Sequence, residues 1–316
     1  MSESALTPVL HHYKISPFSE KMRLVLGYKA LAWRSVSVPN ILPKPDVLAL
    51  TGGYRKTPFL QIGADIYCDT ALICEVLEHL QPQPSLYPQA SKGVARVLAQ
   101  WADSTLFWAA MGYNLSAKGA AALFAHAPPE AAQAFSADRS AMSRGMTRLR
   151  PGDASGIYKS YLRRLSHMLD GQPFLLGDGP CVADFAAYHP LWFTRQVVPV
   201  MASILDATPA VLAWMDRMSA LGHGSSEKWS AEQAIGLALS SQPAALPASD
   251  VFQDDHGIAL GSVVSVAAET FGQEPTQGVL LAATRTRYTL RREDTRAGTV
   301  HVHFPRIGYV LRAVAV

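Results

Sequence analysis

The apolar positions of this chain change their period twice along its length. Residues 1–82 mix short runs of strand-forming residues with stretches whose apolar positions recur at helical spacing. Residues 90–240 keep helical spacing almost throughout, and residues 250–316 return to short alternating runs punctuated by glycines. Proline-containing stretches lie at both changes, as is common between domains. We therefore predict three domains with these boundaries: an α/β domain, an all-helical domain and a small all-β domain.

The pattern of the first domain predicts the order strand, helix, strand, helix, strand, strand, helix. The predicted strands are 8–13, 33–38, 59–62 and 66–68, and the predicted helical segments are 17–29, a turn within 46–50, and 69–80. Ser16 is a good N-cap, and Pro17 suits the first turn of the helix that follows. Asp69 caps the last helix of this domain. Because a helix start presents unpaired N–H groups and partial positive charge, we expect an anion near Ser16.

The apolar pattern of the second domain predicts a series of amphipathic helices. Their apolar positions mark segments at 94–107, 130–146, 158–169, 182–192, 209–221 and 227–239. Asp184 stands three residues after Cys181, which is the spacing of a capping box. A cysteine in place of a hydroxyl residue weakens half of that cap.

Composition limits the compartment and the partners. About half of the 316 residues are apolar and the net charge is only +3, so we expect an ordinary globular protein without a bulk electrostatic partner. Three cysteines without a C-x-x-C pair fit a reducing cytosol. Residues 1–7 lack the features of a signal peptide, and no apolar run approaches the ~20 residues of a membrane span. We predict a cytoplasmic protein without membrane contact.

Three short motifs carry a family resemblance. Ser16-Pro17-Phe18, Thr57-Pro58 and Asp69-Thr70 occur in this order and at these positions of the predicted α/β pattern. The first eighty residues resemble the thioredoxin-like domain of cytosolic glutathione transferases, and the helical domain resembles that of the same family. The Ser-Pro-Phe start is similar to the serine-type classes, such as tau, and to the omega class, in which a cysteine stands where Ser16 stands here. The resemblance covers residues 8–240 and implies a detoxifying transferase, with a homodimer as a possible assembly.

The resemblance also implies how glutathione, the co-substrate, would be held. Ser16 would donate a hydrogen bond to the thiolate, which is the nucleophile that attacks a small hydrophobic electrophile. Thr57 would pair with the cysteinyl backbone, because the Thr57–Pro58 bond of the family's turn is cis. Thr70 would hold the γ-glutamyl carboxylate, and Asp69 the ammonium group.

The glycyl carboxylate and the electrophile are less well specified. Lys44 and Lys56 are candidates for the carboxylate, although most surface lysines are only solvated charges. The electrophile would lie between the domains, lined by helical-domain residues. Phe107, Trp108, Met111 and Tyr113 are suggestive, although aromatic stripes on helices are usually core.

Several alternatives stay open. Ser16 is also explained as a plain helix cap, and Ser19 and Tyr13 compete with it as the hydroxyl beside the thiolate. The family's glutamate-serine pair is Asp69-Thr70 here and a tail is added, so a non-catalytic protein that uses the fold for binding or assembly is the competing class. A thiol-disulfide oxidoreductase is disfavoured because Ser16 and Ser19 supply no sulfur.

The tail lies outside the resemblance. Five short strands are predicted at 263–266, 279–281, 288–290, 300–304 and 309–311, and their even spacing indicates an SH3-like barrel. We expect a separate small barrel that packs on the transferase body, is stabilised by docking against the helical domain, and carries none of the glutathione site. Seven arginines oppose two acids between residues 285 and 312, yet a solvated barrel face explains them better than nucleic acid does. His301 and His303 share one strand face, but no third ligand is evident, so no metal site is predicted.

Overall fold

A computed structural model describes residues 6–247, 251–253 and 255–314. The first part of the chain folds as β1 Val9–His12, α2 Pro17–Tyr28, β2 Trp33–Ser37, α3 Pro45–Thr51, β3 Phe59–Ile62, β4 Asp65–Cys68 and α4 Thr70–Leu80. This is the predicted order of elements. Two of its helices start at side-chain caps: the side chains of Ser16 and Asp69 accept hydrogen bonds from the first turns of α2 and α4.

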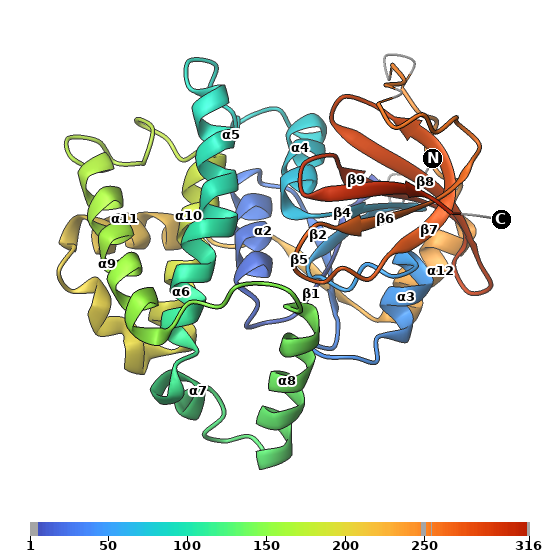
Figure 1. The fold of residues 1–316 in the computed structure, drawn as a ribbon. Coiled ribbons are helices and arrows are strands. Elements are labelled where there is room, and N and C mark those ends of the chain that lie inside the picture. The colour runs from blue at the N-terminus through green and yellow to red at the C-terminus, as the bar shows by residue number, and fades with distance from the viewer. Residues whose placement is uncertain (1–5, 248–250, 254, 315–316) are drawn as a thin grey trace.

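The second part of the chain is helical, and Figure 1 shows it packed to one side of the strands. Its elements are α5 Lys92–Trp101, η1 Ala102–Leu106, α6 Phe107–Asn114, α7 Ala117–Leu123, α8 Pro129–Met142, α9 Pro151–Met168, α10 Val182–Trp192, η2 Phe193–Val197, η3 Pro199–Leu205 and α11 Pro209–Ala220. The predicted long helix at 94–107 is interrupted by η1, a turn of π-helix. None of the described helices is long and apolar enough to cross a bilayer.

The predicted helix at 227–239 begins later than expected. Residues Ser226–Trp229 form β5, which pairs in parallel with β2, and α12 spans Ala231–Ser240. Ser230 caps α12 through a reciprocal box, because its hydroxyl accepts from the Gln233 N–H while the Gln233 amide oxygen accepts from the Ser230 N–H. The strand has no alternating apolar pattern because three of its four residues are exposed at the edge of the sheet.

The tail forms the five predicted strands and joins them to the sheet of the body. They are β6 Val263–Ala268, β7 Thr276–Ala283, β8 Arg287–Asp294, β9 Gly298–Pro305 and β10 Tyr309–Ala313. Among the described strands, β9 pairs with β8 on one edge and in parallel with β4 on the other, while β10 pairs with β6. Within the tail the strands follow the order β10-β6-β7-β8-β9, and β4 of the body pairs with the outer edge of β9, so the β-rich tail is confirmed but the SH3-like barrel is not. One sheet of ten strands results, with the order β10-β6-β7-β8-β9-β4-β3-β1-β2-β5.

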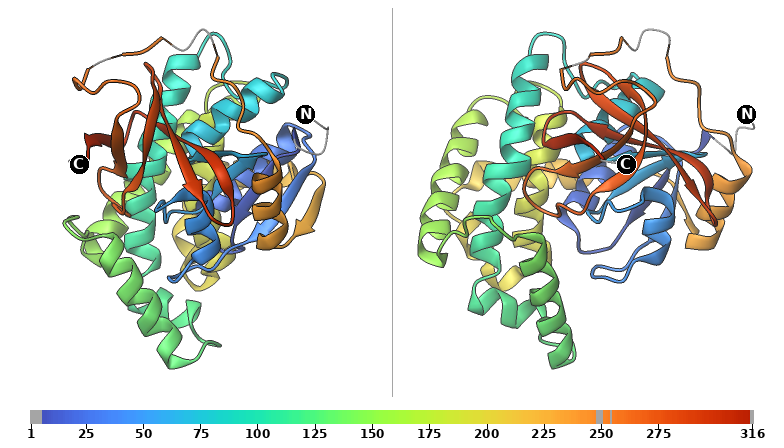
Figure 2. Two further views of the ribbon diagram at one scale, coloured as in Figure 1. Left: turned by 90° about the vertical axis from the view of Figure 1, so that its right-hand side faces the viewer. Right: turned by 45° about the vertical axis from the view of Figure 1, so that its right-hand side comes forward.

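The core is also shared between the tail and the first part of the chain. One apolar cluster fills the space between the helices and one face of the body strands. A second cluster joins Phe59, Ile66 and Cys68 of the body to Leu290 and Val302 of the tail. Both views in Figure 2 show the tail strands lying against the first strands, with α3 and α12 nearby. The tail therefore packs on the body, as expected, and also shares an apolar cluster and a sheet with it.

Burial of His11 makes the stability of the protein depend on pH. The ring is 2% exposed, stacks on Phe59 with centroids 4.2 Å apart, and shares a 2.9 Å hydrogen bond between its Nε2 and the Gln61 Oε1. Burial lowers the His11 pKa from 6.5 to about 4. Below pH 6.5 His11 is therefore protonated in the unfolded chain, whereas in the folded chain it stays neutral down to about pH 4. We expect this residue alone to remove about 3 kcal/mol from the free energy of unfolding across that window.

Urea titrations of the wild type and of His11→Gln between pH 7 and pH 4 test this expectation. The wild type should lose stability more steeply, by about 1.4 kcal/mol per pH unit near the middle of the window, because the variant lacks the titrating ring. Parallel curves for the two proteins would show that His11 is not the group responsible.

Candidate functional site

The register of the sheet brings three turns to one end of it. His11 of β1 lies opposite Phe59 of β3, and Phe59 lies opposite Cys68 of β4. Since β3 runs antiparallel to both neighbours, the segments that follow β1, precede β3 and follow β4 meet at that end. They carry the predicted site residues Ser16, Thr57, Pro58, Asp69 and Thr70.

Ser16 sits at the N-terminus of α2 and is 2% exposed. Its Oγ accepts a 3.2 Å hydrogen bond from the Ser19 N–H. The hydroxyl hydrogen therefore stays available to donate, and within the described residues it meets no protein acceptor. The competing Ser19 hydroxyl is fully buried, with no hydrogen-bond partner among the described residues.

Thr57 and Pro58 are joined by a cis peptide bond, and Thr57 is half-buried. Lys44, one candidate for the glycyl carboxylate, lies against this turn. Its Nζ donates to the Arg55 carbonyl at 3.3 Å and to the Thr57 Oγ1 at 3.4 Å. The side chain is 8% exposed, and burial lowers the Lys44 pKa to about 8, with Arg139 adding to the effect. Lys44 is thus a buried cation beside the turn and not a solvated surface lysine.

Asp69 has a left-handed backbone, with φ 78°, at the start of α4. Its Oδ1 accepts from the Ala71 N–H at 2.9 Å, and its Oδ2 accepts from the Tyr309 hydroxyl at 3.0 Å. Lys56 lies 3.9 Å from the same Oδ2 and 4.6 Å from the centroid of the Tyr309 ring. Because Tyr309 belongs to β10, the tail contacts the side chain of one predicted site residue, Asp69. Lys56, the other candidate for the glycyl carboxylate, therefore lies beside Asp69.

Thr70 is connected to a buried ionic network that the sequence analysis missed. The Lys21 ammonium is fully buried and donates to the Thr70 Oγ1 at 3.1 Å and to the Asp103 carboxylate at 2.5 Å. His189 completes the network, with its Nε2 2.9 Å from the other Asp103 oxygen. Burial alone would lower the Lys21 pKa, but Asp103 outweighs it and the pKa is raised, so the ammonium form is held. The sequence did contain a signal for this network: Lys21 lies four residues before Val25, so it falls on the apolar face of α2.

The segment between β6 and β7, residues 269–275, crosses from the tail strands to the helices, and we call it the strap. Phe271 contacts Trp108 of α6, with ring centroids 5.1 Å apart, and the Gly272 N–H donates to the Met142 carbonyl of α8 at 2.9 Å. Beneath this strap, Arg55 is paired with Asp138 of α8 at 2.5 Å and with Glu274 of the strap. The tail therefore contacts both the first part of the chain, through Arg55, and the helical part, through Trp108 and Met142.

On the other side of α8, Arg139 donates to the Tyr13 hydroxyl at 3.3 Å and to the Asn40 carbonyl at 2.9 Å. Tyr13, the other competitor for the catalytic hydroxyl, is thereby turned toward α8. No periodic signal in the sequence pointed to Arg55 or Arg139, because each acts through a partner far away in the chain.

Comparisons with known proteins agree with this geometry. The N-terminal domain family of glutathione S-transferases matches residues 10–85, and their C-terminal domain family matches residues 139–217. The crystal structure of a GST-like protein from Pseudomonas syringae is 41% identical to this chain, with a TM-score of 0.80. That match covers 98% of this chain and 100% of the other, so it includes the tail.

Two curated relatives match smaller parts. FtsZ-localized protein A of Caulobacter vibrioides is 26% identical over 183 residues, which cover 56% of this chain and 73% of that protein. Pyrimidodiazepine synthase of Drosophila melanogaster is 31% identical over 84 residues, or 25% of this chain. The match spans only about a third (34%) of the length of the Drosophila protein.

Proposed function

Because this chain belongs to the glutathione S-transferase family, we propose that it binds glutathione at the end of its thioredoxin-like sheet and transfers it to a small hydrophobic electrophile. In this proposal the chain is a serine-type enzyme with a tau- or omega-like Ser-Pro-Phe start. Ser16 acts on the thiolate, while Thr57, Pro58, Asp69 and Thr70 hold the peptide.

The observation that carries the proposal is the state of two hydroxyl groups. The oxygens of Ser16 and Thr70 each accept a hydrogen bond from the protein, from the Ser19 N–H and from the Lys21 ammonium. Each hydroxyl therefore has its hydrogen left to donate, and both stand at helix N-termini that favour an anion. Thiolate and carboxylate are the two anions that glutathione would present at these two helix starts.

The chemistry follows from the pKa of a thiol. A free thiol has a pKa of about 8.5, so only a few per cent is thiolate at pH 7. A hydrogen bond donated by Ser16 and the N-terminus of α2 both favour the charged form and lower that pKa. Thr57 would add its backbone N–H and C=O to the cysteinyl backbone, in the manner of an added strand.

The two ends of the tripeptide would each meet a side chain of opposite charge. Lys44, beside Thr57, would attract the glycyl carboxylate. At the γ-glutamyl end, Asp69 retains acceptor sites for an ammonium group, because each carboxylate oxygen accepts more than one hydrogen bond.

Replacement of Ser16 by alanine tests the catalytic role. We expect Ser16→Ala to lower turnover of a generic aryl halide by roughly 10- to 1,000-fold, the range for losing a donor that stabilises developing charge. Glutathione affinity, measured by calorimetry, should change much less, because the other contacts remain. The pH at which turnover is half-maximal should rise, since the thiol of bound glutathione loses its donor.

Matched variants decide between the three hydroxyls. Ser19→Ala removes a hydroxyl one turn further along α2, and Tyr13→Phe removes the phenol that faces Arg139. Both are expected to keep most of the turnover. Full activity of Ser16→Ala together with loss of activity in either control would transfer the catalytic role to that other residue.

A second candidate is a binding or assembly protein without turnover. The observation that favours it is the tail: Tyr309 already donates to Asp69, and Ser16 and Thr70 are 2% and 5% exposed. Similarity to a protein named for its localisation with FtsZ adds to this candidate. Glutathione affinity without turnover of any aryl halide or peroxide, in the wild type, would favour it over the transferase.

We also propose a cytoplasmic protein that forms homodimers and is divided at residues 82–90 and 240–250, with the tail as an addition that contacts both other parts. Its described cysteines Cys68, Cys74 and Cys181 are free and buried, which is in keeping with a reducing compartment.

A further inference from the structure

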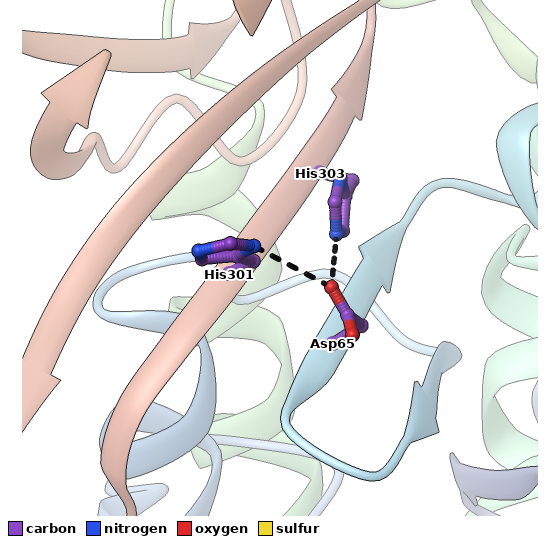
Figure 3. Close-up of side chains that lie close together, drawn as sticks. All are labelled: Asp65, His301 and His303. Atoms are coloured by element: carbon purple, nitrogen blue, oxygen red, sulfur yellow. Dashed lines mark hydrogen bonds and ion pairs between the residues drawn. The ribbon is translucent and has the colours of Figure 1, made fainter. Parts of the chain in front are cut away.

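The seam between the tail and the body carries a cluster of metal-ligand side chains. In the parallel β4–β9 pair, Asp65 lies opposite His301 and Tyr67 lies opposite His303. One ligand atom from each of Asp65, His301 and His303 lies within 4.8 Å of the others. Figure 3 shows both imidazole rings directed at the Asp65 carboxylate. Asp65 of the body is thus a third ligand for the two tail histidines, for which the sequence pattern alone showed none.

The distances suit a tetrahedral transition-metal ion. His303 Nε2 lies 2.9 Å and His301 Nδ1 lies 3.7 Å from the same Asp65 oxygen. Ligand atoms about 2.0–2.1 Å from a tetrahedral zinc ion stand about 3.3 Å apart, between the two observed values. Two imidazoles and one carboxylate are among the ligands that Zn²⁺ takes in proteins, and three protein ligands leave a fourth position for water.

Two further contacts hold the ligands in place. The His303 Nδ1 is 3.0 Å from the Thr289 hydroxyl of β8, which fixes the ring and directs Nε2 to the cluster. The second Asp65 oxygen accepts from the Ala244 N–H at 2.8 Å, so the first oxygen remains directed at the histidines.

The nitrogen of His301 that faces the cluster is the unexplained group. Its Nδ1 is buried and has no hydrogen-bond partner among the described residues, since 3.7 Å is too long for a hydrogen bond to Asp65. Buried polar atoms in folded proteins are normally satisfied, and a bound ion would satisfy this one.

We infer that Asp65, His301 and His303 bind one Zn²⁺ ion, which cross-links β4 of the body to β9 of the tail. The ion takes Nδ1 of His301, Nε2 of His303 and one oxygen of Asp65. Its effect is structural: it holds the seam through which the ten-stranded sheet is continuous. The inference is independent of the transferase proposal, because none of these residues belongs to the glutathione site.

The experiment uses the full chain, stripped with a chelator and titrated with ZnSO₄ by calorimetry, with Co²⁺ as an optical probe. One ion per chain should bind, Co²⁺ should show the intense visible absorption of a tetrahedral complex, and Zn²⁺ should raise the melting temperature. His301→Ala, whose Nδ1 has no protein partner to lose, should keep the fold and abolish stoichiometric binding. Thr289→Val should weaken binding by about 10- to 100-fold.

His79→Ala is the matched control, because His79 is an exposed histidine at the end of α4. It should bind Zn²⁺ as the wild type does. Equal Zn²⁺ affinity of His301→Ala and the wild type, or the absence of any binding to a wild type that circular dichroism shows to be folded, would overturn the inference. Retained binding in His301→Ala together with its loss in His79→Ala would place the ion elsewhere.

Discussion

A chain ending at Pro247 is expected not to fold into a stable body, although every residue of the proposed glutathione site except the Tyr309 contact would still be present. Phe59, Ile66 and Cys68 are fully buried, and the cluster that covers them is completed by tail residues such as Leu290 and Val302. Each large apolar side chain uncovered costs about 1.5–3 kcal/mol, and a domain is stable by only about 5–15 kcal/mol. The truncation also exposes the edge of β4, which is an aggregation hazard.

The measurement is the solubility, the far-ultraviolet circular dichroism and the thermal transition of residues 1–247 beside those of the full chain. The matched control is the full chain with a protease site inserted after Pro247 and then cleaved. Because all tail contacts remain, the cleaved protein should stay folded and its two fragments should elute together. A soluble 1–247 fragment with a cooperative transition near that of the full chain would show that the tail is dispensable for folding.

Asp184→Ala is expected to lower the free energy of unfolding by about 4 kcal/mol. The carboxylate is fully buried and accepts three hydrogen bonds, from the N–H groups of Leu175 and Cys181 and from the indole of Trp214, at 2.9, 3.0 and 2.9 Å. Alanine leaves all three donors buried without an acceptor, and each lost partner costs about 1–3 kcal/mol. Burial raises the Asp184 pKa, and the three hydrogen bonds oppose that shift by stabilising the carboxylate.

Urea denaturation of the variant and the wild type measures this loss. Asp178→Ala is the matched control, since Asp178 lies in the same loop and is exposed. It should change the free energy of unfolding by no more than about 0.5 kcal/mol. A loss below about 1 kcal/mol for Asp184→Ala would mean that other groups or water satisfy the three donors.

Local sequence determined the elements that carry their own signals. Ser16 before Pro17 and Asp69 before Thr70 mark helix starts through short-range capping, and both helices begin there. The alternating runs of the tail mark five strands for the same reason, since each residue's face depends only on its neighbours. The motifs Ser-Pro-Phe, Thr-Pro and Asp-Thr stand at the ends of these elements, and the register of the sheet brings them to one end of it.

Tertiary structure alone decided which distant groups meet. The sequence pattern around Asp65 does not indicate that β9 will pair with β4, because the backbone groups at a strand edge can pair with any other strand. That pairing brings His301 and His303 to Asp65 and Tyr309 to Asp69, and it joins the tail strands to the sheet of the body. The strand β5 was hidden because an exposed edge strand buries too little to alternate. Sequence periodicity thus determined what each segment becomes, whereas the pairing of edges and the burial of Lys21 depended on the whole folded chain.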